Sequence, residues 1–65
     1  MKARTKSYII KKISNNSGTS QCYIHCYPQQ KWSCSFVGNE VHLTYKHLDL
    51  CIERSEFDTY WMIIE

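Results

Sequence analysis

The sequence predicts an α+β domain: a three-stranded antiparallel meander, one helix on its apolar face and a final C-terminal strand, in the order βββαβ. Three observations support it. Residues alternate between apolar and polar on both sides of Pro28–Gln30, a turn-forming cluster at Asn15–Ser20 precedes them, and apolar residues within Thr44–Arg54 follow helical spacing. The alternative is a small all-β five-stranded barrel, in which the stretch from Val41 to Ser55 is a strand.

A β-hairpin is expected over Gln21–Val37, closed by a loop of Pro28–Gln30. Alternation along a strand sorts the residues of both arms into two faces. One face holds Cys22, Ile24, Cys26, Trp32, Cys34 and Phe36, and the other holds Tyr23, His25, Tyr27, Lys31, Ser33, Ser35 and Val37. An odd number of loop residues brings both apolar sets to one core and pairs Cys26 with Trp32.

The segments around this hairpin are assigned in chain order. Residues 1–6 are expected to be a flexible basic arm, and Ser7–Ile13 an edge strand whose inward face is ambiguous. Asn15–Ser20 is expected to join that strand to the hairpin as its antiparallel neighbour. A final strand is expected over Thr59–Ile64. Both of its faces are apolar, so it should be central, covered, or used in a homodimer.

Strand and helix patterns overlap between Val41 and Ser55. The turn residues Gly38 and Asn39 end the preceding strand, and alternation continues for a few residues beyond them. Within Thr44–Arg54, apolar residues recur at helical spacing, and the segment contains no Gly or Pro. Thr44 is an acceptable N-cap. A helix over Thr44–Arg54 is therefore favoured.

Composition indicates a single domain spanning residues 1–65. Eight basic and six acidic residues give a net charge of +2, which is too weak to indicate nucleic acid as the main partner. The chain contains no apolar run long enough for a signal peptide or a membrane span. A cytoplasmic protein is expected, in whatever host makes it, with its four cysteines reduced.

The cysteines and histidines do not match a zinc motif. Cys22 and Cys26 are four residues apart on a strand, so their Cα atoms lie ~13 Å apart, whereas sulfurs on one zinc lie within ~4 Å of each other. The CxxC pairs of zinc ribbons are missing. No metal or cofactor is expected, and the cysteines are expected to act as small buried hydrophobes. No catalytic motif is present, so an enzyme is not expected.

The outward face of the predicted hairpin is the candidate binding surface. Tyrosine is favoured at such surfaces because it offers rigid contact area with one polar tip. The residues assigned to the surface are Tyr23, His25 and Tyr27, with Lys31 beside them and Lys11 and Lys12 from the basic first strand.

Two functions follow from this surface. The compact chain, rich in Lys, Ile, Asn, Ser and Tyr, resembles the small inhibitors that phages and other mobile elements make against host machinery, anti-CRISPR proteins among them. That resemblance implies stoichiometric inhibition, by protein contact, of a host defence complex or enzyme. The alternative is a DNA- or RNA-binding protein, because a three-stranded sheet followed by a helix is similar in outline to the sheet-type DNA-binding domains of integrases and plant AP2 factors.

Overall fold

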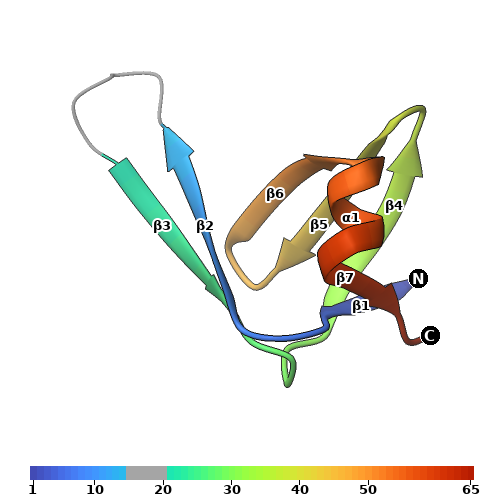
Figure 1. Cartoon of the computed structure of the whole chain (residues 1–65), viewed down its shortest axis with the longest axis horizontal. Helices are drawn as coiled ribbons and strands as arrows, with labels where there is room; N and C mark the ends of the chain where they lie inside the picture. Colours follow the sequence, from blue (N-terminus) through green and yellow to red (C-terminus); the bar gives the residue numbers. More distant parts are fainter. Residues whose placement is uncertain (15–20) are drawn as a thin grey trace.

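The computed structural model describes residues 1–14 and 21–65. In this part of the chain, six strands are followed by one short helix and a last strand (Figure 1). The strands are β1 (Lys2–Thr5), β2 (Ile9–Ser14), β3 (Gln21–Cys26), β4 (Trp32–Val37), β5 (Glu40–Tyr45), β6 (Leu48–Glu53) and β7 (Trp61–Ile63), and the helix is α1 (Arg54–Tyr60). A small α+β chain of mostly antiparallel strands is confirmed. The order βββαβ is not, because six strands precede the helix.

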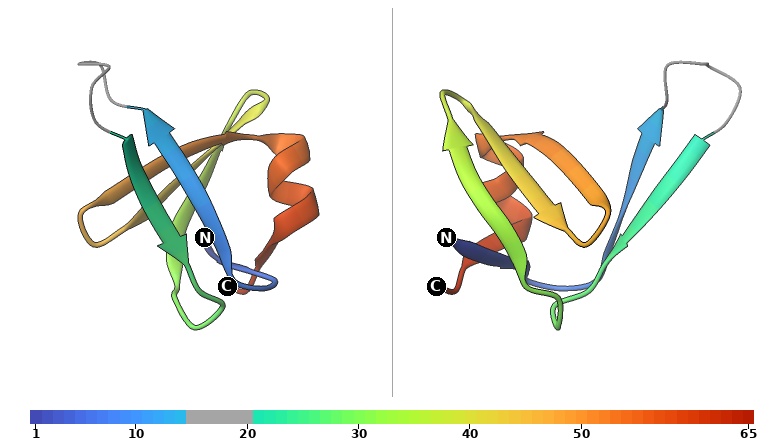
Figure 2. Two further views of the ribbon diagram at one scale, coloured as in Figure 1. Left: turned by 60° about the vertical axis from the view of Figure 1, so that its left-hand side comes forward. Right: turned by 180° about the vertical axis from the view of Figure 1, so that it is seen from behind.

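Five of the strands form one antiparallel sheet in the order β6-β5-β4-β1-β7. β4, β5 and β6 are a meander, and β1 and β7, from near the two ends of the chain, extend the sheet beyond β4 (Figure 2). The edge strands β6 and β7 do not pair with each other. The sheet is therefore not closed into the alternative five-stranded barrel.

β2 and β3 form a separate two-stranded sheet that diverges from the large one (Figures 1 and 2). The expected first strand and its antiparallel neighbour are both present, with Ile9 opposite Cys26 and Ser14 opposite Gln21. The predicted turn at Asn15–Ser20 lies outside the described residues. The pairing with β3 decides which side of β2 faces inward. Ile9 lies opposite the buried Cys26 and shares its face, so Ile9 is on the inward side.

The arms of the predicted hairpin exist, but they do not pair with each other. Cys26 lies opposite Ile9, and Trp32 lies opposite Ala3, so the predicted pairing of Cys26 with Trp32 is wrong. The turn at Pro28–Gln30 carries the chain from the small sheet to the large one. Within each arm, the predicted inward side is nevertheless confirmed for Ile24, Cys26, Trp32 and Cys34, which are buried, and Phe36 is partly buried. The side chain of Cys22 lies outside the described residues.

The helix predicted over Thr44–Arg54 is wrong, because β5 and β6 form a hairpin there. The buried residues of this hairpin are Val41, Leu43, Leu50 and Ile52. The chain reverses at Lys46 and His47, where Lys46 has a φ of 56° in the left-handed region. A turn without Gly or Asn carries little sequence signal. By contrast, the predicted turn after β4 is confirmed, with Gly38 at a φ of 60°.

α1 begins where β6 ends and lies over the apolar inner face of the large sheet (Figure 1). Phe57 is its buried residue. The Phe57 ring packs edge-on against Phe36, with centroids 5.5 Å apart, and stacks on Trp61 at 6.3 Å. One aromatic anchor therefore holds this short helix against the sheet.

The final strand predicted over Thr59–Ile64 is shorter than expected, because α1 extends to Tyr60. β7 pairs with β1 and forms an edge of the sheet, so the first of the three expected possibilities, a central position, does not hold. Met62 and Ile63 are 37% and 39% exposed. Pairing of this edge in a homodimer stays a prediction.

Residues 1–6 are not a flexible arm, because β1 lies between β4 and β7 within the sheet. Ala3 and Thr5 are fully buried, whereas Lys2 and Arg4 alternate with them on the opposite face. Of the basic residues that suggested an arm, Lys2 and Arg4 are thus alternate residues of a strand whose inward side chains are small. Small side chains at Ala3 and Thr5 leave room for the large aromatic residues beside them.

Two cysteines behave as small buried hydrophobes. Cys26 and Cys34 are free and buried, and burial raises the pKa of each thiol. Cys51 is free but exposed, so the expected burial is wrong for this residue. Among the described residues, no helix is long and apolar enough to cross a membrane.

We expect Ala3→Asp to unfold the protein and Lys2→Asp to change its melting temperature far less. A carboxylate at Ala3 would be buried without a partner, at a cost of several kcal/mol, and a domain of this size has only ~3–5 kcal/mol of stability. Thermal unfolding followed by circular dichroism measures the difference. Equal melting temperatures for the two variants would contradict the position of β1 in the sheet.

Candidate functional site

The outward side of the β2–β3 hairpin carries most of the predicted surface. The β2–β3 register, continued by one residue, pairs Tyr8 with Tyr27, and it places Ile10 opposite His25 and Lys12 opposite Tyr23. We call these six residues the aromatic face. Its members are Tyr8, Ile10, Lys12, Tyr23, His25 and Tyr27.

Tyr8 connects the aromatic face through two contacts. Its ring stacks on Tyr27, with centroids 4.8 Å apart, and its hydroxyl is hydrogen-bonded to Nδ1 of His25 at 2.6 Å. Partial loss of hydration and, after it, the neighbouring Tyr27 raise the pKa of the Tyr8 hydroxyl. These three side chains are therefore held in a defined arrangement while remaining on the surface.

The aromatic face is substantially exposed. Tyr8, Tyr23 and Tyr27 are 46%, 54% and 45% exposed, and Ile10 is 52% exposed. Isolated exposed apolar side chains are ordinary, but several that gather on one side of a two-stranded sheet indicate a surface that another molecule can cover. The face carries the cation of Lys12 and no carboxylate.

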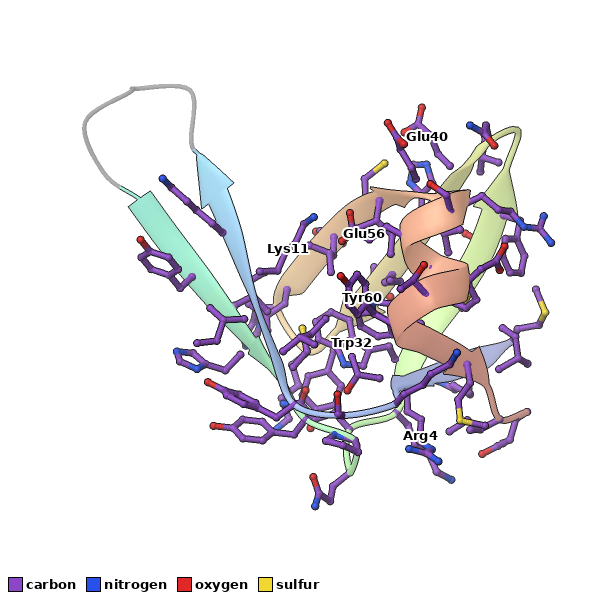
Figure 3. The ribbon with its side chains drawn as sticks, in the orientation of Figure 1. Arg4, Lys11, Trp32, Glu40, Glu56 and Tyr60 are labelled. Atoms are coloured by element: carbon purple, nitrogen blue, oxygen red, sulfur yellow. The ribbon has the colours of Figure 1, made fainter. Side chains whose placement is uncertain are left out.

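The three lysines assigned to the predicted surface lie in different parts of the structure. Lys12 belongs to the aromatic face, whereas Lys11 lies on the inner side of β2 and forms an ion pair with Glu56 of α1 at 2.7 Å (Figure 3). Lys31 lies beyond the turn and forms an ion pair with Glu65 at 2.8 Å. That ion pair raises the pKa of Lys31. The structure thus places Tyr23, His25, Tyr27 and Lys12 on one face and Lys11 and Lys31 elsewhere.

An open concavity of about 450 Å³ lies between β2 and α1. Its lining residues are Ile9, Ile10, Lys11, Glu56 and Tyr60. The Lys11–Glu56 ion pair lies in this concavity, so it joins the small sheet to the helix across the space between them.

A second cluster of polar side chains lies on the solvent side of the β5–β6 hairpin. Glu40, His42 and Cys51 are exposed, and one ligand atom from each lies within 4.8 Å of the others. The Cys51 thiol donates a hydrogen bond to a Glu40 carboxylate oxygen at 2.7 Å, and its sulfur lies 3.9 Å from Nε2 of His42. Among the described residues, these three side chains are the ones that lie close enough together to hold one metal ion.

Sequence reasoning missed Tyr8 and Ile10 on the aromatic face and the whole Glu40, His42 and Cys51 cluster. Alternation in the strands identifies which residues share a face, but neighbours across a hairpin depend on where the chain turns. A helix over Thr44–Arg54 also separates Cys51 from His42. Only a turn at Lys46, which has no turn signature, brings them together.

No protein-family model, curated protein or solved structure matches this chain. Its function must be inferred from its own residues.

We expect Lys11 to contribute to stability through Glu56. In a double-mutant cycle of Lys11→Met and Glu56→Gln, measured by urea unfolding, the coupling free energy should be roughly 0.5 kcal/mol, as for an ion pair whose side chains are 31% and 30% exposed. Lys12→Met with Glu56→Gln is the matched control, because Lys12 is the next residue and lies on the opposite face. Equal coupling in both cycles would contradict a specific contact between hairpin and helix.

Proposed function

We propose that the protein is a small non-enzymatic binding protein that acts by covering a surface on a larger protein. The observation that carries the proposal is the contact of Tyr8 with both Tyr27 and His25 on an exposed face. Side chains already held in place lose less conformational entropy on binding. Tyrosine is also among the residues that contribute most at protein interfaces.

The chemistry of the aromatic face suggests the kind of partner surface. The exposed tyrosine rings and Ile10 offer apolar contact area, and Lys12 can donate hydrogen bonds. Such a face complements a partner surface that combines apolar residues with carbonyl or carboxylate acceptors. The chain's resemblance in character to small phage and mobile-element inhibitors extends the proposal to stoichiometric inhibition of a host defence complex or enzyme.

The nucleic-acid alternative is less favoured because the cations are dispersed. Of the three lysines assigned to the candidate binding surface, Lys11 and Lys31 form ion pairs with carboxylates of the chain itself. Lys2 and Arg4 lie on the solvent side of the large sheet, away from the aromatic face. A phosphate backbone is bound by several cations that follow one surface.

Affinity capture from host-cell lysate, with and without nuclease, tests the proposal. We expect a dominant protein partner whose recovery is unchanged by nuclease and reduced by Tyr8→Ala or Tyr27→Ala. With the purified partner, each substitution should weaken binding by roughly tenfold or more, as at an interface hot spot. Tyr60→Ala is the matched control, because Tyr60 is a similarly exposed tyrosine on α1.

Two results would contradict the proposal. The first is loss of every partner after nuclease treatment. The second is an affinity that falls ~10³-fold or more between about 50 and 200 mM salt, as phosphate contacts require. Deleting residues 1–6 cannot serve as a test of basic contacts, because it removes β1 from the sheet. Lys2→Gln, Arg4→Gln and Lys6→Gln together remove the same side-chain charges and keep the strand.

A further inference from the structure

The cluster of Glu40, His42 and Cys51 is positioned by the β5–β6 register. His42 and Cys51 are directly opposite each other, and Glu40 is two residues before His42 on the same side of β5. Glu40 lies at the end of the sheet where β6 leads into α1, far from Arg4 (Figure 3). The three side chains thus come from two adjacent strands of regular structure, which hold their backbone positions.

The three ligand atoms are spaced closely enough for one metal ion. Zinc bonds of about 2.0–2.3 Å in a tetrahedral arrangement place ligand atoms roughly 3.3–3.8 Å apart. In this cluster the sulfur lies 2.7 Å from the Glu40 oxygen and 3.9 Å from the His42 nitrogen, and no pair exceeds 4.8 Å. The distances between the ligand atoms differ from those around a zinc ion by about 1 Å or less, and rotations of the exposed side chains can remove this difference.

The surrounding charge also favours a cation. Along β6, Cys51 lies between Asp49 and Glu53 on the same face of the strand, and Glu53 is directly opposite Glu40. Neither β5 nor β6 contains a lysine or an arginine. Three carboxylates therefore lie on these two strands, and the nearby cations on the same side of the sheet, Lys2 and the N-terminal amine of Met1, come from the other side of β4, where they line a hollow with His42.

The Cys51 thiol donates a hydrogen bond to Glu40. A metal ion bound at this place would take the position of that proton, because a cysteine binds a metal as the thiolate.

We propose that Glu40, His42 and Cys51 bind one zinc ion, with a fourth position open to water or to a group from another molecule. Thiolate, imidazole and carboxylate are the three ligand types that zinc takes in proteins, and three protein ligands with one open position is a known zinc arrangement. The site differs from the Cys22 and Cys26 pair, which an extended strand keeps apart. Here the ligands are cross-strand neighbours.

Metal titration of the purified full chain tests the site without reference to any binding partner. Zinc binding is measured by calorimetry, and cobalt(II) serves as a spectroscopic probe because a thiolate ligand produces a charge-transfer band in the near ultraviolet. We expect one equivalent to bind and the folded chain to melt at a higher temperature in its presence. Cys51→Ser should abolish the band, and His42→Ala or Glu40→Gln should weaken binding at least about tenfold.

The controls distinguish this site from other histidines, acids and cysteines. His47→Ala changes the histidine at the turn of the same hairpin, Glu53→Gln changes the carboxylate opposite Glu40, and Cys22→Ser changes a cysteine of β3. All three should retain the cobalt band and the stoichiometry. A band unchanged in Cys51→Ser, or no saturable binding up to about 1 mM metal, where the binding free energy is only about −4 kcal/mol, would overturn the proposal. Circular dichroism verifies that each variant is folded.

Discussion

The burial of Trp32 is the interaction on which the rest of the structure depends. Its ring packs edge-on against Trp61, with centroids 5.5 Å apart, and lies 5.3 Å from the ring of Tyr45. It is opposite Ala3, whose methyl group leaves space for the indole on the inner face. Residues near both ends of the chain thus close around one side chain from its middle, which explains why so short a sequence needs β1 and β7 beside β4.

Trp32 is also linked to the aromatic face through Gln30. The side-chain oxygen of Gln30 accepts a hydrogen bond from the Trp32 indole N–H at 3.3 Å and another from the backbone N–H of Tyr27 at 3.0 Å. The same turn that separates the small sheet from the large one therefore ties them together. The contact fixes the backbone of Tyr27, at one end of the aromatic face, relative to the buried Trp32.

The parts of the fold that follow from local alternation could be predicted. Ile24 is inward and His25 outward, as period two requires, and the β-forming residues around them mark β3. The partner strands could not be predicted in the same way. A loop with an odd number of residues allows Cys26 to pair with Trp32, but the turn at Pro28–Gln30 instead sends the two arms into different sheets. The pattern within a strand contains no information about that choice.

The sequence by itself determined which side chains of each strand share a face, because alternation is a local property of an extended backbone. Only the tertiary structure decided which faces meet. Tyr8 reaches His25, and Cys51 reaches His42, because of strand register. Register is set by where the chain turns and by how much apolar area the packed core buries. Those quantities depend on contacts between residues distant in the chain, so the contacts of Tyr8 on the aromatic face and the whole Glu40, His42 and Cys51 cluster become visible only in the folded molecule.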